Sequence, residues 1–227
     1  MKEKTLTEKL LEKSDKTYKN FLKKIIPEIN ENAIIGVRMN EIRKIEKNSA
    51  ETELSEFKKI KHEYLEEKLL HAINISKTKN IIQTTNEIEI FLPQIDNWYV
   101  CDTLRPKNFK KNYDKIKPYI EKWLESNHEY TVRFAIEMLM KNCIENNYEK
   151  EIFEKALYKK SDKYYIQMMQ AWCIAELLAK NENEGLSILT NKKLSKPVYK
   201  KAIQKARESR KINLKLKEYL KTLKSFT

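Results

Sequence analysis

Apolar residues recur at helical spacing along almost the whole chain. Because side chains three and four residues apart share one face of a helix, this spacing predicts amphipathic α-helices. The first sets are Leu6, Leu10 and Leu11, then Tyr18, Phe21, Leu22, Ile25 and Ile26 up to Pro27. Later sets predict helices from about Asn40, over Tyr64–Ile75, over Ile81–Phe91 up to Pro93, and around Trp98 up to Pro106. The second half predicts helices at about 113–125, 129–146, 149–159, 161–180, 197–211 and 213–224.

Polar residues that favour helix starts stand before several of these segments. An oxygen of a Ser, Thr, Asp or Asn side chain at this position accepts a hydrogen bond from a backbone N–H of the first turn. On this basis we expect N-caps at Asp96, Asn127, Ser161, Ser195 and Asn213, with the Ser161-Asp162 start the plainest of them.

Between about residues 80 and 190 the predicted helices follow one another in pairs of roughly 30 to 40 residues. Arg133 and Trp172 lie 39 residues apart, each on a long helix of its pair. This period fits HEAT-like repeats, in which each helix pair packs only on its neighbours. We therefore expect an all-α fold: a superhelical array of HEAT/ARM-like antiparallel helix pairs with a concave groove, in a single domain over residues 1–227.

Composition excludes several other folds. Gly36 and Gly185 are the only glycines among 227 residues, whereas a Rossmann fingerprint or a P-loop needs closely spaced glycines. Two glycines and five prolines also leave too few turns for a sandwich or barrel. No apolar run approaches the ~18 residues of a membrane helix. Met1–Lys13 lacks the apolar stretch of a signal peptide, so we expect a cytoplasmic protein away from membranes.

The metal-ligating residue types are few and scattered. Three widely spaced cysteines indicate buried thiols in a reducing compartment, not a disulfide framework or a zinc site: Cys101, Cys143 and Cys173. The histidines also lack metal-ligand spacing, since only His62 and His71 are near each other in sequence and His128 is remote. We expect neither a metal site nor another cofactor.

Positive charge is concentrated at the C-terminal end. The chain carries a net charge of +13, and residues 191–227 alone hold 13 Lys/Arg against 2 Glu. A basic helix face is typical of a polyanion partner, most often nucleic acid, although a solvated lysine-rich surface has the same composition. The candidate DNA-binding residues here are Lys201, Gln204, Lys205, Arg207 and Arg210. A second basic patch follows Asp102 and includes Lys107 and Lys110.

Three segments carry residue types that suit one extended ligand. Trp98 and Asp102 stand at i and i+4, so they lie one above the other on a helix face. Arg133 falls in the first turn of a later helix, and Trp172 in the middle of another. In order and residue type, this set resembles the HEAT-like-repeat alkylpurine DNA glycosylases of bacteria, which are DNA alkylation repair proteins.

The resemblance covers about residues 36–212. It includes the Gly36-Val37-Arg38 segment, which adds Arg38 to the candidate DNA-binding residues, and the basic stretch Lys201–Ser209. The chain before Gly36 departs from the better-known members because it is shorter and more acidic. The resemblance therefore implies a branch with a shortened N-terminal DNA-binding motif.

The resemblance implies a monomeric, monofunctional glycosylase that hydrolyses the N-glycosidic bond of cationic N3- or N7-alkylpurines in double-stranded DNA. Asp102 would stabilise the oxocarbenium-like sugar and orient the attacking water. Trp98 and Trp172 would flank the damaged nucleotide through their indole faces. Arg133 would hold a phosphate by charge-assisted hydrogen bonds.

Structural roles for the same residues remain open at this point. Asp102 could pair with Arg105, and Arg133 with Glu137 one turn later, as surface ion pairs of small energy. A lone tryptophan on an apolar helix face is most often part of the core, and we assign Trp123 to the core. The alternative function is a catalytically inactive HEAT-like relative that serves as a nucleic-acid- or protein-binding scaffold.

Overall fold

The computed structural model describes residues 4–223, and the fold over this range is entirely helical. It contains fourteen α-helices, three short 3₁₀ helices and no strand within the described range, which confirms the all-α prediction. None of the described helices combines the length and the apolarity needed to cross a bilayer. The chain divides into two compact units, Met1–Asn108 and Phe109–Thr227. The superhelical HEAT-like array and the single domain stay predictions.

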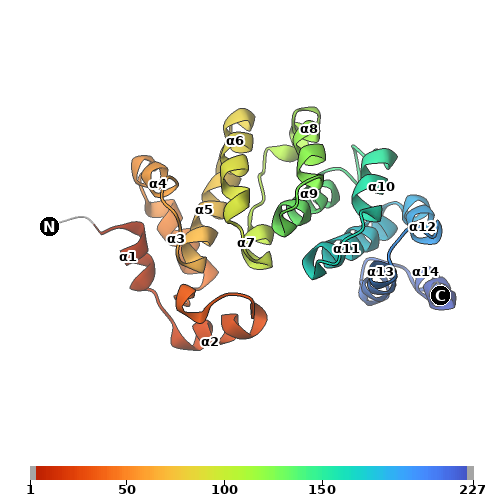
Figure 1. Cartoon of the computed structure of the whole chain (residues 1–227), viewed down its shortest axis with the longest axis horizontal. Helices are drawn as coiled ribbons and strands as arrows, with labels where there is room; N and C mark the ends of the chain where they lie inside the picture. The colour runs from red at the N-terminus through yellow and green to blue at the C-terminus, as the bar shows by residue number, and fades with distance from the viewer. Residues whose placement is uncertain (1–3, 224–227) are drawn as a thin grey trace. The chain divides into compact units, whose positions relative to one another are not determined.

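The first unit is built around α5, which contacts α1, α3, α6 and α7 (Figure 1). Its buried side includes Leu65, Leu69, Leu70 and Ile75, so this helix supplies much of the unit's core. The elements of the unit are α1 Leu6–Leu11, α2 Lys16–Ile25, η1 Glu31–Ala33, α3 Met39–Asn48, α4 Glu51–Phe57, α5 Leu65–Lys77, α6 Ile81–Phe91, η2 Leu92–Gln94 and α7 Trp98–Thr103.

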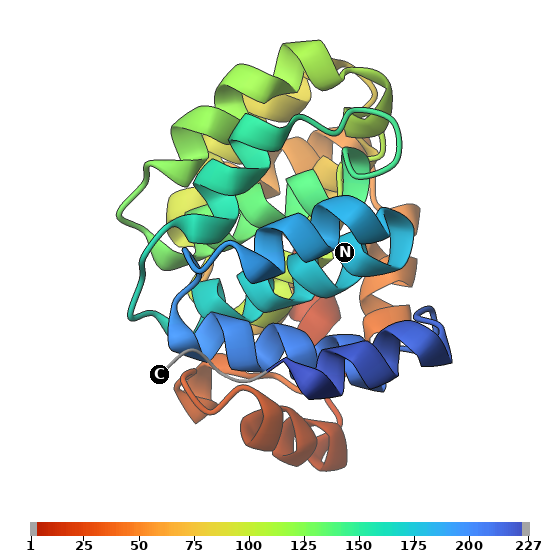
Figure 2. The same ribbon diagram turned by 90° about the vertical axis from the view of Figure 1, so that its right-hand side faces the viewer.

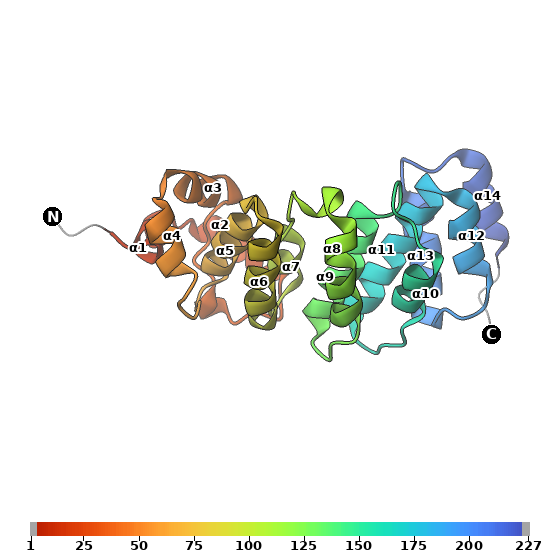
Figure 3. The same cartoon turned by 90° about the horizontal axis from the view of Figure 1, so that it is seen from above.

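The second unit contains a row of three contacting helices, α9, α11 and α13, which follow one another in Figure 3. α8 packs on α9, α10 on α9 and α11, α12 on α11, and α14 on α13. The elements are η3 Phe109–Lys111, α8 Tyr113–Leu124, α9 Glu129–Asn142, α10 Lys150–Tyr158, α11 Tyr164–Lys180, α12 Glu182–Thr190, α13 Lys196–Glu208 and α14 Leu214–Thr222.

The helices of this row are parallel. At their starts, the Glu129 carboxylate of α9 accepts a hydrogen bond from the Tyr165 backbone N–H of α11 at 3.0 Å. Near their ends, Glu145 pairs with Lys180 at 3.0 Å. Lys211, just after α13, pairs with Glu176 near the end of α11 at 2.8 Å. Side chains on one face of the three helices can therefore form rows that run in the same direction.

Several predicted helix starts were wrong by one to three residues. The N-cap of α7 is Asn97, not Asp96, because Asn97 accepts from the backbone N–H of Val100 at 2.9 Å while Asp96 pairs with Lys68. α9 begins at Glu129 as predicted, but its N-cap is His128, not Asn127. Ser161 forms a local turn with the Lys163 N–H at 3.1 Å, so α11 starts only at Tyr164.

The two remaining starts agree with the sequence. Ser195 is the N-cap of α13 by position, without a side-chain hydrogen bond, and Asn213 accepts from the Leu216 N–H at 2.8 Å. The predicted ends of α9 and α13 were too late, at 146 and 211. The predicted last helix extends to Lys224, which lies outside the described residues together with the rest of 224–227. Two helices, α4 and α12, were not predicted.

Close packing at Gly185 explains why α12 lies against α11. A Cβ at Gly185 would stand 2.7 Å from the Leu178 Cα, so only glycine permits this approach.

Trp123 is confirmed as a core residue, 2% exposed and in ring contact with Phe134 at 5.3 Å. The three cysteines are confirmed as buried free thiols.

A buried carboxylate holds the segment before α3 in place. Glu66 of α5 is fully buried and accepts hydrogen bonds from the backbone N–H groups of Ile35, Gly36 and Val37 at 2.9, 2.7 and 3.1 Å. Gly36 has φ +95°, a conformation that side chains with a Cβ rarely adopt. Its carbonyl accepts from the Asp15 N–H at 3.0 Å. Glu66 therefore links α5, the Gly36 turn and the start of α2.

The substitution Glu66→Ala should lower the free energy of unfolding by at least ~3 kcal/mol, because three buried N–H groups would each lose a partner at ~1–3 kcal/mol. Urea denaturation measures this change. The exposed Glu63, three residues earlier, supplies a matched control that should shift stability by no more than ~0.5 kcal/mol. Equal effects of the two substitutions would contradict the linking role of Glu66.

Two histidines form a buried pair in the first unit. His62 Nε2 and His71 Nδ1 lie 2.8 Å apart, and the two residues are 4% and 2% exposed. Phe57 stacks on His62 and Phe91 contacts His71. Burial lowers the pKa of His62 to about 4 and that of His71 to about 3. Both imidazoles are therefore neutral in the folded protein at physiological pH.

This pair should make the fold sensitive to acid. The unfolded imidazoles have a pKa of ~6.5, so below that pH the unfolded chain binds more protons than the folded one. Stability is thus present above about pH 6.5 and is lost as pH falls toward the folded pKa values, about 4 and 3. Unfolding free energy from pH 7 to pH 4 should fall by at least ~3 kcal/mol more in the wild type than in His62→Gln/His71→Gln.

The substitution Gln83→Ala serves as the control for this experiment, because Gln83 is exposed and does not titrate. It should leave the pH dependence of stability as in the wild type. If the double variant lost stability as steeply as the wild type, the buried pair would not be the source of the acid sensitivity.

Candidate functional site

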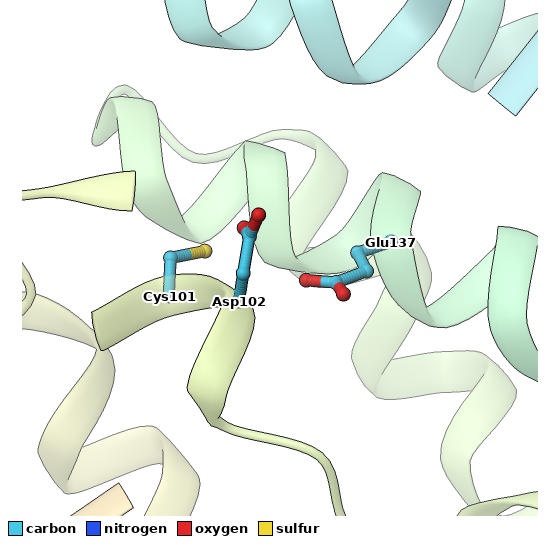
Figure 4. A group of neighbouring side chains, drawn as sticks. All are labelled: Cys101, Asp102 and Glu137. Atoms are coloured by element: carbon cyan, nitrogen blue, oxygen red, sulfur yellow. The ribbon is translucent and has the colours of Figure 1, made fainter. Parts of the chain in front are cut away.

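α7 presents Trp98 and Asp102 one helical turn apart, as the sequence predicts. Both are half-buried, so each keeps part of its side chain in solvent. Val100 and Cys101 are fully buried, and the helix packs on α5. Figure 4 shows Cys101 and Asp102 on consecutive positions of α7, and Glu137 on α9 of the second unit. A carboxylate therefore stands one turn from an indole on a firmly anchored short helix.

Trp98 also fixes the end of α2. Its indole Nε1 donates to the carbonyl of Ile25, the last residue of α2, at 3.2 Å. The final carbonyls of a helix lack partners within the helix, so this bond satisfies one of them. The Trp98 ring also lies 5.6 Å from that of Tyr99. The N–H of Trp98 is thus used within the protein, while part of the residue remains in solvent.

An aromatic cluster extends from α7 to α2, and its members were missed in the sequence. The Tyr18 and Tyr99 hydroxyls lie 3.4 Å apart, and the Tyr18 ring stacks on Phe21, which is 50% exposed. Burial raises the pKa of the Tyr99 phenol. The signal was present in Lys16–Lys24, where lysines alternate with Tyr18 and Phe21, a combination suited to nucleic acids.

Arg38 lies beside this cluster. Its guanidinium stands 5.0 Å above the Tyr18 ring. Its Nε and Nη2 both donate to one oxygen of Asp15, at 3.1 and 2.9 Å. The pKa of Asp15 is lowered, first by the hydrogen bond from the Tyr18 N–H and then by Arg38. Arg38 therefore helps to hold the start of α2, and an incoming phosphate would compete with Asp15 for it.

Arg133 of α9 is buried, with 5% of its surface exposed. It is the fifth residue of α9, so it opens the second turn, not the first as predicted. Its Nη1 donates to the Tyr165 carbonyl at 2.9 Å, and its guanidinium lies 5.9 Å from the Tyr165 ring. The arginine is therefore held in a fixed position between α9 and α11.

Trp172 belongs to a partly exposed stripe along α11 that consists of Tyr165, Met168, Trp172 and Glu176. The Lys141 ammonium, at the end of α9, stands 4.9 Å from the Trp172 ring. An indole face attracts a cation by about 0.5–2 kcal/mol, depending on how well water is excluded. The ammonium of Lys141 therefore already lies against the ring of Trp172, one of the predicted site residues.

The basic residues of α13 divide between two faces of the helix. Lys201 and Lys205 are half-buried on the side of Arg133; burial, followed by the neighbouring charge of Lys201 and that of Arg133, lowers the pKa of Lys205. Gln204 and Arg207 instead line a groove against α14. The two groups meet at Lys201, whose Nζ donates to the Gln204 Oε1 at 2.9 Å, and Arg210 lies in the exposed turn that follows.

A family model that describes a DNA alkylation repair enzyme matches residues 3–206. This range is nearly the whole chain. The protein belongs to the DNA alkylation repair enzyme family. No curated protein matches the sequence. The resemblance identified in the sequence is thereby confirmed at the level of the DNA alkylation repair family, whereas the glycosylase branch and its shortened motif stay predictions.

The other two candidate DNA-binding residues of this DNA alkylation repair protein fall in different units. Lys107 is exposed just after α7 in the first unit. Lys110 belongs to η3 in the second unit and lies 3.5 Å from the Glu145 carboxylate. Of the predicted catalytic residues, Trp98 and Asp102 are together in the first unit, and Arg133 and Trp172 in the second.

The Arg133 side of α13 should contribute directly to DNA affinity. Each phosphate contact by a cation adds about one to the slope of log affinity against log salt. Lys201→Glu/Lys205→Glu should therefore weaken duplex binding at least ~10-fold at low salt and reduce that slope by about two. Fluorescence anisotropy with an undamaged duplex over a salt series measures both quantities.

The matched control is Lys150→Glu/Lys160→Glu, which changes the net charge equally at two exposed positions near the ends of α10. It should leave the salt slope nearly unchanged. An equal loss of affinity in both double variants would show that net charge alone, and not this face of α13, determines DNA binding.

Proposed function

We propose that this protein is a monofunctional DNA glycosylase that releases cationic N3- or N7-alkylpurines from double-stranded DNA. The observation that carries the proposal is the Trp98–Asp102 pair on α7, in a chain that belongs to the DNA alkylation repair enzyme family. A carboxylate and an indole one turn apart, both partly open to solvent, suit a cationic nucleotide whose sugar becomes positive during the reaction.

Asp102 carries the chemistry in this proposal. As the N-glycosidic bond breaks, its electron pair moves onto the alkylated base, which leaves neutral, and positive charge develops on the sugar. A carboxylate next to the sugar lowers the energy of that transition state electrostatically. Water then adds to the anomeric carbon and gives up a proton, for which Asp102 is the acceptor or the orienting group. The products are free base and an abasic site.

In this proposal the second unit provides most of the contacts that bind DNA. The parallel α9, α11 and α13, each backed by an outer helix, support the view that the chain is a HEAT-like-repeat array. Lys201 and Lys205 keep part of their side chains in solvent and offer positive charge to phosphates, and the charge of the buried Arg133 lies near Lys205. Trp172 offers an indole face to a cationic base. We further propose that the protein acts as a monomer.

One observation favours a second candidate function, a non-catalytic scaffold for nucleic acid or protein. The polar groups that a lesion-binding site would use already have partners: the Trp98 N–H binds the Ile25 carbonyl, and Arg133 binds the Tyr165 carbonyl. A scaffold of this kind would bind duplex DNA with strong salt dependence and release no base.

The substitution Asp102→Asn tests the catalytic role. It removes the negative charge while keeping the size of the side chain, so release of 7-methylguanine from a duplex should fall at least ~100-fold. Single-turnover release of free base, measured by chromatography, is the readout. Duplex affinity and the unfolding midpoint should remain close to the wild-type values.

Asp96→Asn provides the matched control, because Asp96 is an exposed carboxylate just before α7 that pairs with Lys68. Its release rate should equal that of the wild type. Wild-type protein that binds duplex but releases no base above the spontaneous rate, at high enzyme concentration, would favour the scaffold. Release that survives Asp102→Asn would remove Asp102 from the mechanism.

A further inference from the structure

A groove lies between α13 and α14, and neither Lys201 nor Lys205 lines it. Figure 2 shows the two helices side by side at the C-terminal end of the second unit. The groove has a volume of about 520 Å³. It is lined by Lys200, Ile203, Gln204, Arg207, Glu208, Leu214, Lys217, Glu218 and Lys221.

The groove has more basic than acidic lining residues. Its two carboxylates are already engaged: Glu208 accepts from the Gln204 amide at 2.8 Å, and Glu218 pairs with Lys221 at 2.5 Å. Its other three cations have no carboxylate within 4.0 Å among residues 4–223; they are Lys200, Arg207 and Lys217. These three cations are available for negative groups of a partner.

The groove also has an apolar part. Leu214, the first residue of α14, is 78% exposed, and Ile203 of α13 is half-buried. α14 is held in place by other residues, Leu216 and Leu220, which are 4% and 1% exposed. The exposed Leu214 is therefore not needed to anchor its helix, and it remains free to cover an apolar side chain of a partner.

We propose that the groove between α13 and α14 binds an acidic, amphipathic peptide segment of a partner protein. A helix of this kind lays its apolar residues into a groove and its carboxylates against the rim. Here Leu214 and Ile203 would contact the apolar residues, and the three unpaired cations would meet carboxylates. A nucleic-acid backbone fits less well, because it offers no apolar group to the exposed Leu214.

This binding site is separate from the proposed glycosylase reaction. The family match ends at residue 206, so α14, which forms one wall of the groove, lies outside it. Lys201 and Lys205, which we assign to DNA, do not line the groove. The peptide interaction and base release should therefore be separable by substitution.

The test uses a fluorescent synthetic peptide of about four helical turns, with leucines on one face and glutamates beside them. The full-length protein should bind it measurably by fluorescence anisotropy. The variant Leu214→Ser/Lys217→Glu, at two solvent-accessible positions of α14, should bind it at least ~10-fold more weakly while keeping the wild-type rate of base release. Lys150→Glu/Lys160→Glu, which reverses two charges outside the groove, should bind the peptide like the wild type.

Two further probes make the test decisive. A peptide with glutamine in place of each glutamate should bind at least ~10-fold more weakly, and a short undamaged duplex should not displace the acidic peptide. Equal binding of the two peptides, displacement by duplex, or no loss in the α14 variant would overturn the proposal. Circular dichroism of each variant establishes that the helices are intact. Absence of base release in the wild type would affect only the glycosylase proposal.

Discussion

The buried carboxylate of Glu66 is the interaction on which the arrangement of the first unit depends. It joins three consecutive backbone N–H groups to the central helix α5 and so fixes a turn that only glycine adopts easily. The carbonyl of Gly36 then sets the start of α2, and the end of α2 receives the indole N–H of Trp98. The position of the indole on α7 is therefore connected, through α2, to a carboxylate far from it in sequence. A local pattern of apolar residues does not predict this series of contacts.

Helical periodicity was sufficient to predict the fold class and most helices, because apolar residues recur every three or four positions along them. Helix starts were less predictable, since side chains such as Ser161 make equally good hydrogen bonds in a turn that precedes the helix. α12 escaped prediction for another reason. Its packing depends on the missing side chain of Gly185 against Leu178, and periodicity does not register an absent side chain.

The candidate site likewise combines features that local sequence spacing predicts with features that depend on packing between helices. The sequence placed Trp98 and Asp102 correctly on one helix, because their spacing is local. It did not indicate that Arg133 is buried against the Tyr165 carbonyl, since that contact joins two helices. From the sequence alone, we also expected the basic residues of α13 to form one surface. Which of them face α14 depends on how α14 packs, and that packing is determined by long-range burial of Leu216 and Leu220.

The lysine on the Trp172 ring has a consequence for selectivity. An indole face that already holds an ammonium group is not vacant, so an arriving cationic base must exchange with Lys141. The energy available for recognition is then the difference between two cation–indole contacts, not the full ~0.5–2 kcal/mol of one. A difference of that kind favours the ligand whose charge is more delocalised and costs less to remove from water. Trp172 would thus select between different cations, and an uncharged base would gain no cation–indole energy by displacing the lysine.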